Sequence, residues 1–67
     1  MALDWDDLAA VVELADAELR ALRGAVAARD VDAMSVAGER LRVVSVTARQ
    51  FVRVLAARER VAGDGAA

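Results

Sequence analysis

The stretch of residues 34–55, MSVAGERLRVVSVTARQFVRVL, decides the fold. Its apolar residues recur at steps that alternate between three and four, which places them along one line of a helix: Met34, Ala37, Leu41, Val44, Ala48, Phe51 and Leu55. Such a line is the seam of a helix that packs against another helix, and its alanines let the neighbour come close. The stretch therefore predicts a long helix with one face covered by a second helix.

The first part of the chain supplies that second helix. It carries a line with the same alternating steps: Trp5, Leu8, Val12, Ala15, Leu19, Leu22 and Val26. Asp4 and Asp7 are spaced for a capping box at its start, and Leu3 and Leu8 are placed as a hydrophobic staple. We expect a helix over about residues 5–28.

A turn is expected at about residues 29–30, with Asp30 as the cap of the next helix. No glycine or proline forces this break, so one continuous long helix is the alternative. Arginines gather before the break and aspartates after it, which suits the end of one helix and the start of another. The second helix should run over about residues 31–61, through the β-branched run 43–47, and end in a frayed tail at residues 62–67 that contains Gly63 and Gly65.

These elements predict an all-α fold, a single domain spanning residues 1–67 that forms an antiparallel two-helix hairpin. The acids that fill the first half of helix 1 would then lie alongside four arginines of helix 2: Arg49, Arg53, Arg58 and Arg60. This complementarity favours the antiparallel direction. Asp16 and Arg20 are spaced to pair on the exposed side of helix 1.

Helix 2 carries a second apolar line beside its seam, so its apolar surface is wider than one neighbour can cover. A hairpin of this size also has a small core. We therefore expect a homodimer in which two hairpins form a four-helix bundle. The expected interface is the second line together with the flank of helix 1: Val11, Leu14, Val36, Val43, Val54 and Val61.

Composition limits the possible functions. The 67 residues include no cysteine, histidine or lysine, and all nine positive charges are arginine, a usage typical of a GC-rich bacterial genome. The usual general base, the thiolate ligands and the Schiff-base amine are thus missing, so we expect no enzyme activity, no cofactor and no metal site. The N-terminus is acidic and no apolar run is long enough to span a bilayer, which favours a cytoplasmic protein without a membrane span.

Two groups of residues are candidates for contacting a partner. The first is an arginine stripe on helix 2, away from its seam: Arg42, Arg49, Arg53 and Arg60. The second is Trp5, which either closes the core at the open end of the hairpin or anchors a partner. Asp4, Asp6 and Asp7 form an acidic cluster, which is expected to serve the helix start rather than a cation. Glu59 falls near the seam side of helix 2, beyond the expected reach of helix 1, so this end should be open to water or to another protein.

Two functions fit this pattern. The first is a non-catalytic protein–protein interaction module, an adaptor, regulator or chaperone-like protein that acts as a homodimer. The second is a binder of nucleic acid or an anionic surface through the arginine stripe, although the formal charge of −2 makes a nucleic-acid partner the weaker expectation.

Overall fold

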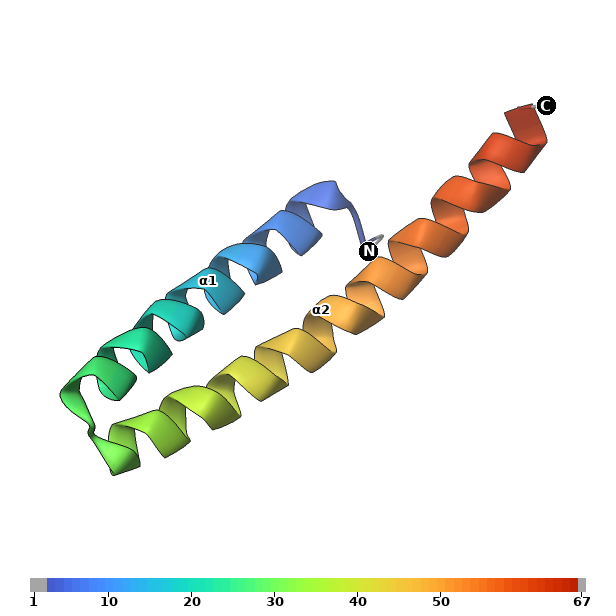
Figure 1. Ribbon diagram of the computed structural model, residues 1–67. Coiled ribbons are helices and arrows are strands. Elements are labelled where there is room, and N and C mark those ends of the chain that lie inside the picture. The colour runs from blue at the N-terminus through green and yellow to red at the C-terminus, as the bar shows by residue number, and fades with distance from the viewer. Residues whose placement is uncertain (1–2, 67) are drawn as a thin grey trace.

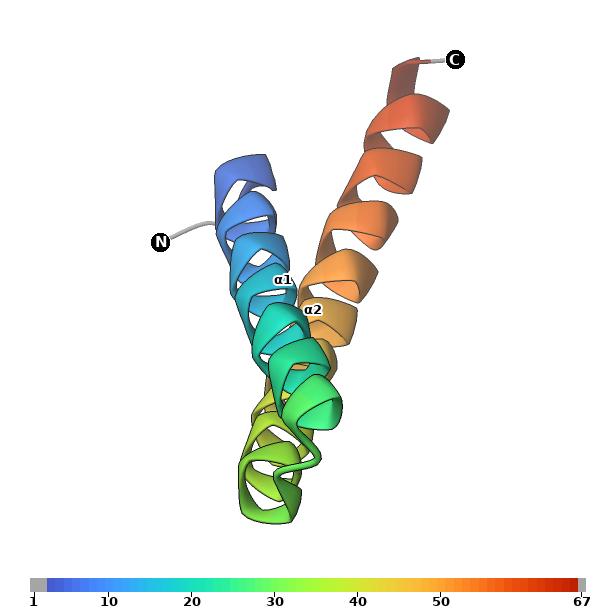
Figure 2. The ribbon, with the colours of Figure 1, turned by 60° about the vertical axis from the view of Figure 1, so that its left-hand side comes forward.

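The computed structural model describes the backbone of residues 3–66 and the side chains of residues 3–63. It contains two α-helices, α1 (Trp5–Ala28) and α2 (Val31–Ala66), which lie side by side in opposite directions (Figure 1). The predicted all-α hairpin is confirmed. The molecule is a rod of 54 × 22 × 15 Å, and α2 extends past the start of α1 and leans away from it (Figure 2).

The start of α1 is fixed by its own acidic side chains. The Asp7 N–H donates to Asp4 Oδ1 at 3.1 Å, and the Asp4 N–H donates to Asp7 Oδ2 at 2.9 Å. This reciprocal pair is the predicted capping box, and it satisfies backbone donors that have no partner inside the helix. Asp4 and Asp7 thus already have a structural role.

The turn is closed by backbone hydrogen bonds without a glycine. Arg29 takes a left-handed conformation (φ 55°, ψ 35°), its N–H donates to the Val26 carbonyl at 3.1 Å, and the Asp30 N–H donates to the Ala25 carbonyl at 3.0 Å. This pattern is a Schellman motif, which usually places glycine where Arg29 stands. Asp30 Oδ1 then accepts from the Ala33 N–H at 3.1 Å and caps α2 as predicted. The alternative of one continuous helix is therefore wrong.

The predicted end of the second helix near residue 61 is also wrong, because α2 continues to Ala66. A glycine ends a helix when it adopts a positive φ, and none of the described glycines does so. Gly63 instead stays helical, where it only lowers helix propensity. The β-branched run is helical too, and Thr47 Oγ1 donates to the Val43 carbonyl one turn earlier at 3.2 Å.

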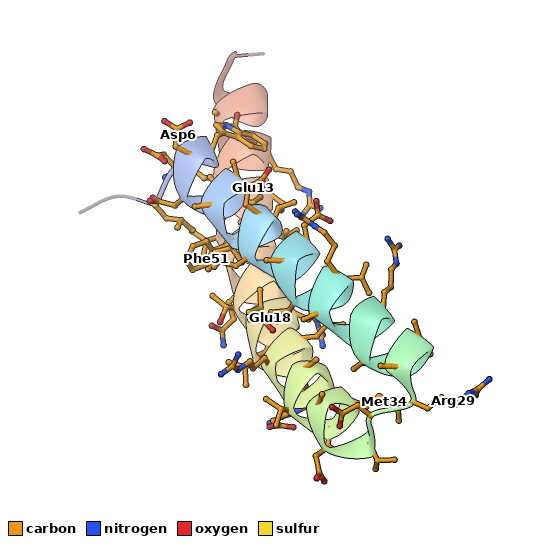
Figure 3. All side chains as sticks on the ribbon, turned by 90° about the vertical axis from the view of Figure 1, so that its left-hand side faces the viewer. Asp6, Glu13, Glu18, Arg29, Met34 and Phe51 are labelled. Atoms are coloured by element: carbon orange, nitrogen blue, oxygen red, sulfur yellow. The ribbon has the colours of Figure 1, made fainter. Side chains whose placement is uncertain are left out.

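The core lies along the line where the two helices meet. Its buried apolar residues are Val11 and Ala25 of α1 and Ala37 and Leu55 of α2, and Leu55 is only 1% exposed. The predicted seam of α2 holds along its length, with Leu41, Val44, Ala48 and Phe51 half-buried between the two ends. Figure 3 shows Phe51 beside the first half of α1. Met34, near the turn, is the most exposed member at 38%.

The predicted seam of α1 needs a correction. The residues facing α2 are Leu8, Val11, Ala15, Glu18, Leu22 and Ala25, all buried or half-buried. This set shares Leu8, Ala15 and Leu22 with the predicted line, while Trp5, Val12 and Val26 are exposed. Both sets have steps that alternate between three and four, so spacing alone cannot choose between them. Packing against α2 sets the rotation of α1 about its axis, and this rotation decides which of the two lines faces α2.

Candidate interaction surface

The largest unpartnered feature of the hairpin is the second apolar line of α2, which we call the valine line: Val36, Val43, Val54 and Val61. Between 51% and 71% of each of these residues is exposed. They lie on one flank of the α2 seam because the steps of seven and eleven residues return to nearly the same side of a helix with 3.6 residues per turn. The structure thus leaves this line open along most of α2.

Leu14 of α1 lies on the same side of the hairpin as the valine line and is 57% exposed. Val11 was predicted to join it there, but Val11 is 8% exposed and lies in the seam between the helices. The reason is the rotation of α1, which turns Val11 inward. The candidate surface therefore consists of Leu14 and the valine line.

A second apolar surface was not predicted as such, and we call it the tryptophan line: Trp5, Val12, Leu19 and Val26 of α1. Its members are seven residues apart. Leu19 is half-buried and the other three are more than half exposed. The seven-residue spacing was visible in the sequence, but these residues were assigned to the internal seam.

The two lines lie on opposite sides of the hairpin. Trp5 Nε1 donates to Glu59 Oε1 at 3.2 Å, which fixes the side of α2 that adjoins the tryptophan line. On a helix of 3.6 residues per turn, Glu59 lies on the flank of the α2 seam away from the valine line. The hairpin therefore has two separate apolar faces.

The Trp5–Glu59 contact also settles two expectations about the open end. Glu59 was predicted to lie beyond the reach of helix 1, which is wrong because it accepts the indole hydrogen bond. Trp5 is 60% exposed, so the indole adjoins α2 at its edge without being enclosed there. Most of its ring surface stays accessible.

Charged side chains form one ion pair within residues 3–63. Arg42 Nη2 lies 2.6 Å from Glu39 Oε1, one turn apart on the exposed side of α2. The hydrogen bond from Arg42, and then the guanidinium charge, lower the pKa of Glu39. The same hydrogen bond, and then the carboxylate charge of Glu39, raise the pKa of Arg42. The expected pair of Asp16 with Arg20 does not form, nor does any ion pair between α1 and α2 in this part of the chain.

The other members of the arginine stripe, Arg49, Arg53 and Arg60, form no ion pair with the described residues. Arg49 and Arg53 line a shallow hollow of about 200 Å³ on the outer side of α2, together with Val46 and Gln50. The stripe follows the same flank of α2 as Glu59, next to the face that carries the tryptophan line. Three guanidinium groups without an ion pair to the described residues thus border one apolar face.

Comparison with models of known protein families, with curated proteins and with solved structures gives no match. In the described part of the chain, neither helix has an apolar stretch that could cross a membrane.

Proposed function

We propose that this chain is a small non-catalytic protein–protein interaction module, an adaptor, regulator or chaperone-like protein, which acts as a homodimer. The observation that carries the proposal is the exposed valine line, which extends from Val36 to Val61. Two copies related by a twofold axis would bury these lines, with Leu14, at the centre of a four-helix bundle.

The exposed area of the hairpin supports this assembly. The chain exposes 5182 Å², whereas a compact protein of 7.1 kDa exposes about 4,100 Å². The difference is comparable to the roughly 800 Å² that each partner contributes to a specific protein interface. The radius of gyration of 16.0 Å likewise exceeds the roughly 11 Å of a compact chain of this length.

The small core supports the same conclusion. Two of the four buried apolar residues are alanines, which contribute little apolar area. Chains of this size usually gain further stability from disulfides, metals or oligomerisation, and this chain has no cysteine. Association of two copies would supply the missing burial.

Sedimentation equilibrium over a concentration series tests the proposal. We expect a mass of two chains at micromolar concentration, and a mass of one chain for a variant that carries both Val43→Asp and Val54→Asp. Val52→Asp is the matched control, because Val52 is 49% exposed on the other flank of α2 and should leave the dimer intact. A stable monomer of the unaltered chain at micromolar concentration would overturn the proposal.

The arginine stripe supports a second candidate, binding of nucleic acid or an anionic surface, because Arg49, Arg53 and Arg60 have no ion pair with the described residues. The formal charge of −2 counts against it. A salt titration separates the two: binding to DNA or anionic vesicles should weaken steeply with salt, whereas association through the valine line should not.

A further inference from the structure

The helix α1 carries two overlapping seams rather than one. Leu8, Ala15 and Leu22 belong to both. Val11, Glu18 and Ala25 complete the seam that faces α2, and the tryptophan line completes the other. The tryptophan line is more apolar than the three residues that complete the internal seam. It contains tryptophan, valine and leucine, whereas the internal seam is completed by Val11, Glu18 and Ala25.

A helix with two complete seams of alternating three and four steps has the pattern of a helix packed between two neighbours. One neighbour of α1 is α2. Most of the tryptophan line has no neighbour within the hairpin, and its spacing of three and four residues is that of a helix–helix contact. A third helix therefore fits the tryptophan line.

The adjoining flank of α2 leaves room for such a helix, and its arginines favour acidic residues on that helix. Gly38, Ser45 and Ala56 lie on this flank, and a methyl group built on Gly38 would meet no atom within 4 Å. Small residues of this kind let a neighbouring helix approach closely. Beyond them runs the arginine stripe, in which Arg49, Arg53 and Arg60 have no ion pair with the described residues.

We propose that the tryptophan line docks one amphipathic helix of another protein, whose apolar stripe is bordered by acidic residues on the side that faces α2. The apolar stripe packs against Trp5, Val12 and Val26, and the acidic residues pair with Arg49, Arg53 and Arg60. This inference rests on the proposed function and deepens it by naming the partner. The helix occupies the face opposite the valine line, so it binds while the dimer stays intact.

A second copy of the chain is the alternative occupant of this face. A parallel pair of tryptophan lines would set Glu13 and Asp16 next to the same acids of the other copy, where like charges repel, whereas an antiparallel pair would set them near Arg20 and Arg23. A separate helix with acidic borders also pairs with Arg49, Arg53 and Arg60, and the mass of Val12→Asp separates the two occupants.

The test uses the full chain and two synthetic helical peptides of about three heptads with leucine at the seam positions. One peptide carries glutamates beside its leucines, and the other carries lysines at the same places. Trp5 is the only tryptophan, so a shift of its emission to shorter wavelength reports burial of the tryptophan line directly. We expect the glutamate peptide to bind at least about tenfold more tightly than the lysine peptide.

Variants of the chain locate the binding surface. Val12→Asp should weaken binding of the glutamate peptide by about tenfold or more, whereas Val43→Asp, on the valine line, should leave it unchanged. A double change of Arg49→Glu and Arg53→Glu should reverse the preference between the two peptides. Circular dichroism of each variant confirms that the helices are retained.

Four results would overturn the inference. Equal binding of the two peptides would remove the role of the arginine stripe, and loss of dimer mass in Val12→Asp would make a second copy the occupant. Displacement of the glutamate peptide by a DNA oligonucleotide would make nucleic acid the occupant. The last result is an absence of peptide binding. If the unaltered chain is then still a dimer and the double Val43→Asp, Val54→Asp variant is a monomer, this inference fails and the proposed function stands.

Discussion

Leu55 and Leu14 are the same residue type on helices that pack together, but Leu55 is 1% exposed and Leu14 is 57% exposed. The difference separates two sets of apolar residues. One set lies between α1 and α2 and holds the hairpin together, and the other set lies on the two outer faces and contributes much less to the hairpin alone. Mutations in the first set should therefore act at any protein concentration, and those in the second only where a partner is bound.

The largest effect should come from Leu55→Ala. Removal of a fully buried leucine side chain loses its burial and leaves a cavity, so we expect the free energy of unfolding to fall by about 2–5 kcal/mol. That loss is a large share of the stability of a chain of 67 residues. Urea denaturation followed by circular dichroism measures it.

Leu14→Ala is the matched control for Leu55→Ala. We expect it to change stability by less than about 0.5 kcal/mol at concentrations where the chain is monomeric, because the side chain is exposed there. At concentrations where dimers form, the loss should become larger. Equal effects of the two changes at low concentration would show that the two sets of apolar residues are not distinct.

The neighbours Val11 and Val12 make the same comparison within a single turn of α1. Val11 is 8% exposed and Val12 is 51% exposed. Val11→Ala should therefore lower the free energy of unfolding by about 1–2 kcal/mol, at about 0.8 kcal/mol for each buried methylene. Val12→Ala should be close to neutral in the chain alone. Thermal unfolding of both variants at low concentration decides which of the two seams of α1 faces α2.

The same pair of residues shows what the sequence could predict and what it could not. Steps of three and four residues, together with Asp4, Asp7 and Asp30, were enough to predict two helices, their caps and the hairpin. They were not enough to choose between Val11 and Val12, because Leu8, Ala15 and Leu22 belong to both possible seams. That choice depends on how α1 rotates against α2, which is a property of packing rather than of spacing.

At two helix ends the structure differs from what the sequence predicts, and each difference has a local physical cause. The glycine at position 63 was expected to end the second helix, but a glycine does so only with a positive φ, and Gly63 stays helical. Conversely, the left-handed residue that ends α1 is Arg29, a residue type that gives no such signal in a sequence. Of the candidate surfaces, the valine line could be read from the sequence, whereas the tryptophan line became visible only once the internal seam was known.

The turn offers a smaller test of how the hairpin is held. Arg29 has φ 55°, a conformation that costs an L-residue with a side chain more than it costs glycine. Arg29→Gly should therefore raise the free energy of unfolding by about 1 kcal/mol, and Figure 3 shows that the arginine side chain points away from the hairpin, so no contact is lost. Arg23→Gly, in the interior of α1, is the control and should lower stability by a similar amount. A loss of stability in Arg29→Gly would contradict the proposed strain at the turn.

The smallest effect should come from the ion pair on the outer side of α2. The Arg42 guanidinium lowers the pKa of Glu39 from its ordinary value of 4.5, first through the hydrogen bond and then through its charge. A carboxylate whose pKa is lower in the folded chain adds stability above its unfolded pKa, and this contribution is lost as the pH falls through the folded pKa. Glu39→Gln should therefore lower stability slightly at neutral pH, less than the changes at Leu55, Val11 and Arg29, because both side chains are exposed. The difference from the unaltered chain should disappear in acid. Denaturation of both proteins across this pH range measures it, and a difference that grows toward acid pH would show that the pair does not stabilise α2.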